Sequence, residues 1–144
     1  MAAHYRHTQQ GRLMLTVLLL SAAGLATVSM LEPSSPVRLV PRFLAVGSAI
    51  LAWLFSSLTV EVDENELRWY FGPGIWRYRI ARADIESVGH VRNHWWNGFG
   101  IRINRGFRLY NVSGFDAVEL RLKTGAVRRI GTDEPQALAN ALRS

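Results

Sequence analysis

The sequence of 144 residues contains no cysteine. This absence excludes a disulfide framework, thiolate metal sites and a cysteine nucleophile. Lysine is nearly absent as well, since Lys123 is the only one among 17 basic residues. Charge of either sign is scarce in the first 60 residues, which carry only Arg6, Arg12, Glu32, Arg38 and Arg42. This N-terminal part therefore does not have the composition of a soluble domain.

The sequence also lacks the common motifs of catalysis and cofactor binding. The Gly-Phe-Gly segment at 98–100 has neither the third glycine nor the following helix of a dinucleotide fingerprint. The closely spaced histidine pairs, His4 with His7 and His90 with His94, fall in a polar tail and in strand-like sequence, where their rings do not converge on a metal ion. We therefore predict no catalytic residues, no metal and no cofactor, and do not expect an enzyme.

Two long uncharged stretches dominate the N-terminal part. Leu13–Leu31 has nineteen residues and Phe43–Val60 has eighteen. As a helix, the first would be about 28 Å long, close to the hydrocarbon thickness of a bilayer. The loop 32–42 contains three prolines, which interrupt a helix. These features predict a transmembrane helical hairpin over residues 13–60, preceded by a polar tail at 1–12.

Two other structures are compatible with such stretches. The first stretch follows Arg6 and Arg12, as the apolar part of a signal peptide follows its basic part. It is longer than the usual apolar region of about 7–15 residues, however, and no clean cleavage site follows it. Both stretches are also compatible with buried helices of a soluble protein, but two of this length are unusual in so short a chain. The hairpin is therefore the favoured interpretation.

The arginines bear on the orientation of the hairpin. Arg6 and Arg12 precede the first span, whereas Arg38 and Arg42 lie in the loop, so the count is equal on the two sides. The arginine-rich C-terminal segment adds to the side of the termini. Because basic residues accumulate on the cytoplasmic side, both termini are predicted to be cytoplasmic.

From Leu58 onward, apolar residues alternate with polar ones. Each run therefore has one apolar and one polar face, as antiparallel strands on one side of a core require. Residues that favour turns, mainly glycine, asparagine and proline, separate the runs. The clearest runs are 58–62, 67–71, 76–80 and 118–122, and further strands are expected at 85–91, 100–103, 107–112 and 127–130.

The chain ends with helical periodicity over residues 133–143. Thr132 offers a capping side chain, and Pro135 is favourable in a first helical turn. Leu138 and Leu142 are four residues apart, so they share one face of the helix. We expect this helix to lay its leucines on the sheet or at one end of it.

The predicted fold class is membrane-anchored α+β: a two-helix transmembrane hairpin, then a mainly antiparallel β barrel or sandwich over residues 61–144, closed by the C-terminal helix. Three segments are distinctive: WNGFGIR at 96–102, LYNVSGFDAVE at 109–119 and RIGTDEP at 129–135. In these segments and in the order of its elements, the chain resembles the bacterial pleckstrin-homology-like membrane proteins with two N-terminal spans. The resemblance implies a pleckstrin-homology-like β domain at the bacterial inner membrane. It supplies neither a settled activity nor a catalytic site to carry over to this chain.

An aromatic cluster interrupts the strand pattern at Trp95, Trp96 and Phe99. Because adjacent residues of a strand face opposite ways, we expect Trp96 to pack in the core and Trp95 to be exposed. An exposed tryptophan favours either a protein interface or the bilayer interface. These three residues are the candidate partner-binding site.

Basic residues suggest a second surface. Arg77 and Arg79 share the outer face of one predicted strand, and Arg121 and Lys123 share that of another. If these faces merge beside the membrane, each residue would contribute about 1 kcal/mol of attraction to acidic headgroups. Residues 61–144 carry 13 basic and 10 acidic side chains, so nucleic-acid binding is not expected.

The expected function is therefore that of a non-enzymatic, membrane-anchored interaction or scaffold module. It would bind a protein partner, or further copies of itself, at the membrane. The alternative is a sensor of anionic lipid headgroups that uses the four basic residues on the outer strand faces.

Overall fold

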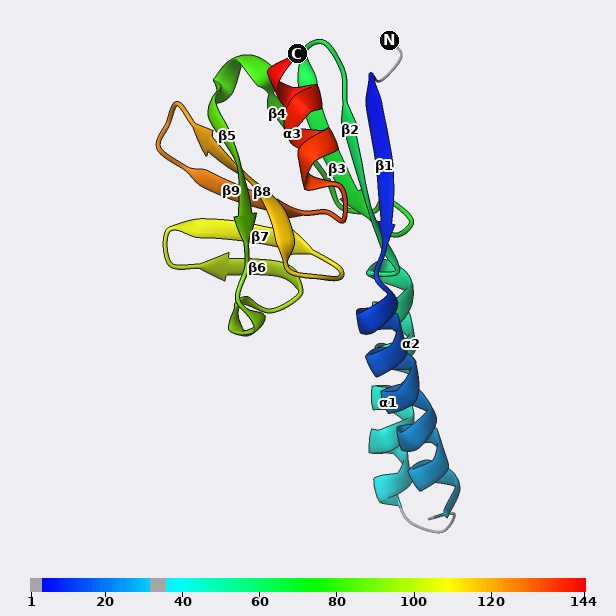
Figure 1. Ribbon diagram of the computed structural model, residues 1–144. Helices are drawn as coiled ribbons and strands as arrows, with labels where there is room; N and C mark the ends of the chain where they lie inside the picture. The colour runs from blue at the N-terminus through cyan, green and yellow to red at the C-terminus, as the bar shows by residue number, and fades with distance from the viewer. Residues whose placement is uncertain (1–3, 32–35) are drawn as a thin grey trace.

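The computed structural model describes residues 4–31 and 36–144, which form a helical hairpin and a β domain (Figure 1). The fold is α+β, with three α-helices and two sheets in the described residues. In chain order the elements are β1 (Tyr5–Gln10), α1 (Arg12–Leu31), η1 (Pro36–Arg38), α2 (Leu39–Leu54), β2 (Ser57–Val62), β3 (Glu66–Phe71), β4 (Arg77–Ala81), η2 (Arg82–Asp84), β5 (Ile85–Arg92), η3 (Trp95–Asn97), β6 (Gly100–Asn104), β7 (Phe107–Asn111), β8 (Asp116–Leu122), β9 (Val127–Gly131) and α3 (Pro135–Arg143).

The strands form two separate sheets. Sheet A has the order β1-β2-β3-β4 and is antiparallel throughout. Sheet B has the order β5-β8-β9-β7-β6, in which β7 and β9 are parallel and the other pairs antiparallel. No strand of one sheet pairs with a strand of the other in the described residues, so the alternative of a closed barrel is wrong. The chain leaves sheet A through η2, which turns it away before β5 begins.

One core lies between the two sheets and α3. The alternation predicted from the sequence is confirmed in β2 and β3, where Leu58, Val60, Val62, Leu67, Trp69 and Phe71 are buried, and in β8 at Val118 and Leu120, whereas Leu122 at its end is half-buried. At the centre, Trp69 stacks on Tyr78 with 5.6 Å between ring centroids and meets Tyr110 of sheet B edge-on at 5.1 Å. Leu138 and Leu142 of α3 are also buried in this core, as their spacing predicted.

The segment before the first helix is part of sheet A. Residues 1–12 were expected to be a polar tail, but Tyr5–Gln10 form β1 and pair with β2 from Tyr5↔Val62 to Gln10↔Ser57. The chain therefore enters the hairpin from β1 and returns from it into β2 (Figure 1). The hairpin is an insertion in the turn between two neighbouring antiparallel strands.

The helices differ from the predicted spans mainly at their ends. The second span was expected at 43–60, but α2 is Leu39–Leu54, and the residues from Ser57 onward belong to β2. Pro41 did not prevent the earlier start, because it lies in the first turn, where backbone N–H groups have no partner within the helix. Part of the expected loop 32–42 is helical from Pro36, and residues 32–35 lie outside the described residues.

A polar contact holds the two helices together near the tip of the hairpin. The hydroxyl of Ser29 donates to the carbonyl of Arg38 at 3.1 Å and accepts from Nε of Arg42 at 3.0 Å. Ser29 is buried, so both hydrogen bonds satisfy a polar group that has no access to water.

Asp63 organises the turn between β2 and β3. Its Oδ1 accepts hydrogen bonds from the backbone N–H groups of Asn65 and Glu66 at 2.9 and 2.7 Å, and its Oδ2 accepts one from Arg68 at 2.8 Å. The two backbone hydrogen bonds, and next the charge of Arg68, lower the pKa of Asp63 below its ordinary value of 3.8.

This lowered pKa predicts an acid dependence of stability. The ionised carboxylate is favoured in the folded state, so its contribution is complete above the unfolded pKa and is lost as the pH falls through the folded one. We expect the free energy of unfolding of the wild type to fall below about pH 4, and the Asp63→Asn variant to lose this part of the dependence. Denaturant unfolding in detergent micelles between pH 2 and pH 6 measures the difference. Parallel curves for the two proteins would contradict the prediction.

Candidate functional site

The outer face of sheet A carries a row of charged side chains across all four strands. In the strand register, Arg6 lies opposite Glu61, Glu61 opposite Arg68, and Arg68 opposite Arg79. These residues alternate with the buried ones, so they point away from the core. The row extends to Arg6 because β1 joins the sheet.

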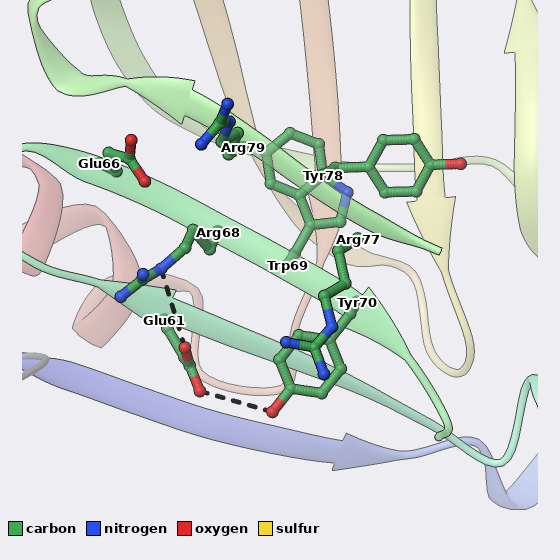
Figure 2. A pocket seen from close by; sticks show the side chains of 8 residues that line it. All are labelled: Glu61, Glu66, Arg68, Trp69, Tyr70, Arg77, Tyr78 and Arg79. Carbon is green, nitrogen blue, oxygen red and sulfur yellow. Dashed lines mark hydrogen bonds and ion pairs between the residues drawn. The ribbon is translucent and has the colours of Figure 1, made fainter. Parts of the chain in front are cut away.

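Glu61 is the acidic centre of this row (Figure 2). Its carboxylate lies 3.3 Å from Nε of Arg6 and 3.9 Å from Nε of Arg68, and it accepts a hydrogen bond from the hydroxyl of Tyr70 at 3.4 Å. Arg68 is paired with Asp63 as well. Arg6 is thus neutralised by Glu61, and Arg68 is neutralised by Glu61 and by Asp63 of the β2–β3 turn.

The arginines of the edge strand β4 are not neutralised in this way. In residues 4–31 and 36–144, neither Arg77 nor Arg79 has a carboxylate within 4.0 Å. Arg77 donates to the carbonyl of Gly74 at 3.0 Å, and its guanidinium lies 5.3 Å from the centroid of the Tyr70 ring. Arg79 lies directly opposite Arg68. Because Arg68 is paired with Glu61 and Asp63, the positive charge of Arg79 is the less balanced of the two.

A shallow depression lies on this face. Its volume is about 370 Å³, and it is lined by residues of β2, β3 and β4, all drawn in Figure 2: Glu61, Glu66, Arg68, Trp69, Tyr70, Arg77, Tyr78 and Arg79. The side chains of Trp69 and Tyr78 point to the core, so these two contribute from the strands themselves. We call the four arginines that point outward from sheet A the arginine face: Arg6, Arg68, Arg77 and Arg79. Guanidinium groups stay protonated at neutral pH, so this arrangement suits recognition of carboxylate or phosphate groups rather than proton transfer.

The candidate lipid-binding residues do not share one face. Arg77 and Arg79 lie together on β4, as expected, but Arg121 lies on β8 of sheet B and Lys123 directly follows that strand. Because the core lies between the sheets, their outer faces point away from each other. The condition for the lipid hypothesis, that these strand faces merge beside the membrane, is therefore not met by this set of four.

The aromatic cluster lies in the loop between β5 and β6. Trp95 is 75% exposed, as expected, but Trp96 is 63% exposed, so its expected place in the core is wrong. Both residues belong to the 3₁₀ turn η3, in which neighbouring side chains do not alternate between faces as they do in a strand. Trp96 stacks instead on His94, with 4.3 Å between ring centroids, and Phe99 is half-buried.

The histidines are engaged in ion pairs or hydrogen bonds with carboxylates or in ring stacking. His7 lies 2.6 Å from Asp133, and His90 lies 3.0 Å from Asp116. No group of three potential metal ligands occurs in the part of the chain that the structure describes.

Comparison with known proteins gives no relative: no protein-family model matches the chain, and no curated protein matches it significantly.

Proposed function

We propose that α1 and α2 span a bilayer and hold the β domain against it. The segments Arg12–Leu31 and Pro36–Leu54, of 20 and 19 residues, are long and apolar enough to cross a membrane. Only 6% and 11% of their residues are buried within the protein, whereas the core helix of a soluble domain is mostly buried. Large apolar side chains such as Leu20 and Phe43 are exposed along the hairpin, and lipid would cover them.

The position of β1 supports a hairpin that remains attached. A signal peptide is removed by cleavage after its apolar helix. Here the chain before that helix supplies an edge strand of sheet A, and cleavage after α1 would remove the strand that pairs with β2. Both helices thus serve as a permanent anchor.

We assign the chain to the bacterial pleckstrin-homology-like membrane proteins, with the β domain on the cytoplasmic side of the inner membrane. The order of elements supports this assignment: two apolar helices, mainly antiparallel sheets, and a C-terminal helix whose leucines enter the core. The β domain carries most of the basic residues, whereas the tip of the hairpin carries Arg38 and Arg42. The positive-inside rule then favours a cytoplasmic β domain.

On this anchor, the β domain acts as a non-enzymatic interaction module that binds an acidic segment of a protein partner on the arginine face. The observation that carries this proposal is the pair of arginines on β4, Arg77 and Arg79, which lie beside the depression and have no carboxylate within 4.0 Å among the residues that the structure describes. Charge complementarity selects the occupant, because aspartate and glutamate side chains form paired, charge-assisted hydrogen bonds with guanidinium groups.

A labelled peptide rich in glutamate tests this proposal with the full chain in detergent micelles. In the Arg77→Glu/Arg79→Glu variant, attraction is replaced by repulsion at two positions. We expect binding to become about tenfold weaker, which corresponds to about 1.4 kcal/mol. Fluorescence anisotropy of the peptide measures the dissociation constant, and added salt should weaken wild-type binding because exposed charges are screened.

The matched control is the Arg121→Glu/Lys123→Glu variant, which makes the same change of net charge on the other sheet. Equal loss of binding in both variants would mean that only net charge matters, and would refute a site on the arginine face. A photo-reactive benzoylphenylalanine at Thr8, which lies beside this face, then identifies the partner in native membranes. A crosslinked species of twice the chain's mass would show that the protein assembles with itself instead.

A further inference from the structure

The β domain sits directly on the ends of the two helices. Gly11 alone separates β1 from α1, and Phe55 with Ser56 separates α2 from β2. The N–H of Gly11 donates to the carbonyl of Ser56 at 2.8 Å, so the sheet hydrogen bonding continues to the start of the helices. A Cβ atom at Gly72 would lie 2.5 Å from the carbonyl oxygen of Leu54, so the β3–β4 turn packs on the end of α2. This arrangement leaves no flexible linker that would let the domain move away from the bilayer.

Aromatic residues gather around this junction. Phe55 meets Phe71 edge-on at 5.1 Å and stacks on Trp76 at 6.0 Å between ring centroids. A Cβ atom at Gly100 would lie 3.7 Å from Cε of Met14 in the first turn of α1, so the start of β6 lies against that helix. Trp76, in the β3–β4 turn, is exposed to solvent although it stacks on the end of the anchor.

The η3 turn, which contains Trp95 and Trp96, lies at the same level of the backbone. Figure 1 shows the segment between β5 and β6 beside the hairpin, at the height of the first turn of α1. Phe99, next to Gly100, is 6.4 Å from Phe115 between ring centroids, which brings the β7–β8 turn to the same end of the domain. We call the exposed apolar residues at this end the juxtamembrane cluster: Ile75, Trp76, Trp95, Trp96 and Phe115.

The charged residues at the hairpin end of the domain differ from those at the distal end. Arg12 begins α1, and Arg102, whose Nε donates to the carbonyl of Phe99 at 2.9 Å, lies beside the η3 loop. The acidic turn that contains Asp63 and Glu64 joins the opposite ends of β2 and β3, farthest from the hairpin. The end of the domain at the helices is thus aromatic and carries Arg12 and Arg102, whereas at the far end of sheet A the carboxylates of the turn lie beside Arg68 and Arg82.

The geometry points to the headgroup layer of the spanned bilayer as the occupant of the juxtamembrane cluster. Tryptophan is favoured at this depth because its ring is apolar and its N–H can bond to water or headgroups, and arginine pairs with lipid phosphate. Because the sheet connects directly to the helices, the cluster lies at the depth of the headgroups whenever the helices span the bilayer. The cluster therefore fixes the tilt of the β domain and the direction in which the arginine face points. This inference rests on the proposed membrane anchor.

The absence of native cysteine allows a direct test by depth-dependent fluorescence quenching in the full chain. A single cysteine at Asn97, labelled with an environment-sensitive nitrobenzoxadiazole dye, reports on the η3 loop without removing either tryptophan. The protein is reconstituted into vesicles of phosphatidylcholine, with or without phosphatidylglycerol, that contain lipids spin-labelled near the headgroup. We expect strong quenching at Asn97 in both kinds of vesicle. A dye at Glu64 serves as the distal control and should be quenched little.

A dye at Leu20, an exposed position of α1, separates the two proposals. Quenching at Leu20 by lipids labelled deep in the acyl chains reports the anchor, so its loss would overturn the anchor itself. Quenching at Leu20 together with a signal at Asn97 no stronger than at Glu64 would overturn only the inference about the cluster. If aqueous iodide and the spin-labelled lipids both fail to reach Asn97, the cluster is covered by protein, which also overturns it.

The Trp95→Ser/Trp96→Ser variant tests the tryptophans themselves. Both side chains are exposed, so the fold should survive the change, and an unchanged near-ultraviolet circular dichroism outside the tryptophan bands would confirm this. We expect quenching at Asn97 to fall measurably, because the tilt of the domain relaxes, but to stay above that at Glu64, because the junction still holds this end near the headgroups; quenching at Leu20 stays constant. Unchanged quenching at Asn97 in this variant would show that the tryptophans do not seat the domain.

Discussion

Replacing Arg12–Phe55 by the dipeptide Asn-Gly is expected to release the β domain as a folded, water-soluble protein. The last strand pairs before the hairpin are Gln10 with Ser57 and, through a backbone hydrogen bond, Gly11 with Ser56. A two-residue loop is enough to connect two antiparallel strands of this kind, and Asn-Gly is a preferred sequence for the type I′ turn that such a loop forms. The hairpin can therefore be removed without breaking either sheet.

The energetic cost of this excision is small compared with what the domain retains. Phe55 is lost, and with it the edge-on contact to Phe71. A half-buried phenylalanine is worth about 1–2 kcal/mol of apolar burial, against a total stability of about 5–15 kcal/mol for a small domain. The core of Trp69, Tyr110 and Leu138 remains complete.

The measurement is gel filtration in buffer without detergent, followed by circular dichroism and thermal unfolding. A monomer with a β-rich spectrum and cooperative melting is the expected result.

A chain that starts at Arg12 but keeps the hairpin is the opposite control. It lacks β1, whose Gln9 donates to the carbonyl of Ser113 at 3.0 Å and so ties sheet A to sheet B. We expect this chain to lose cooperative unfolding in micelles. An excised domain without β-rich structure or cooperative melting, or normal folding of the truncated chain, would contradict the insertion of the hairpin between β1 and β2.

Elements with strong local signals were predictable from the sequence. The strands β2, β3 and β8 were found because their apolar residues alternate over five residues or more, and α3 because its leucines are spaced by four. The two apolar helices were found from length and composition alone, although their ends shifted by several residues. Each of these signals is carried by neighbouring residues, so no knowledge of the rest of the fold is needed.

β1 had no such signal. Its sequence, YRHTQQ, turns Tyr5, His7 and Gln9 toward the core side, and only the first of these is largely apolar. The segment is a strand because β2 pairs with it, and the whole hairpin separates the two in the chain. Arg77 and Arg79 of the arginine face were expected together on one strand, but the extension of this face to Arg6 was missed for the same reason. Arg6 reaches Glu61 only through this long-range pairing, so neither the pairing nor the row of charges could be derived from local patterns.

Gly131→Ala is expected to be strongly destabilising, although it adds a single methyl group. Gly131 is buried at the end of β9, and a Cβ atom there would lie 2.6 Å from Cγ of Asn111. Asn111 is itself buried, donates to the carbonyl of Gly114 at 2.9 Å and accepts from the N–H of Ser113 at 3.2 Å. It cannot move aside without breaking the hydrogen bonds that hold the β7–β8 turn.

The expected cost combines overpacking, at about 1–3 kcal/mol, with the loss of a buried hydrogen bond, at about 1–3 kcal/mol. A total of about 3 kcal/mol would lower the melting temperature of a domain of this size by about 10–20 °C. Thermal unfolding of the full chain in micelles, followed by tryptophan fluorescence, measures the shift.

Two further variants show whether the clash with Asn111 is the cause. Gly89→Ala is the matched control on β5, because a Cβ atom there has no neighbour within 4 Å, and its effect should stay within about 0.5 kcal/mol. In the Asn111→Ala background, Gly131→Ala should cost much less than in the wild type, since the two residues then no longer collide and their effects are not additive. Equal costs in the two backgrounds would mean that the methyl group at position 131 acts through the backbone of β9 rather than through the side chain that shapes the β7–β8 turn.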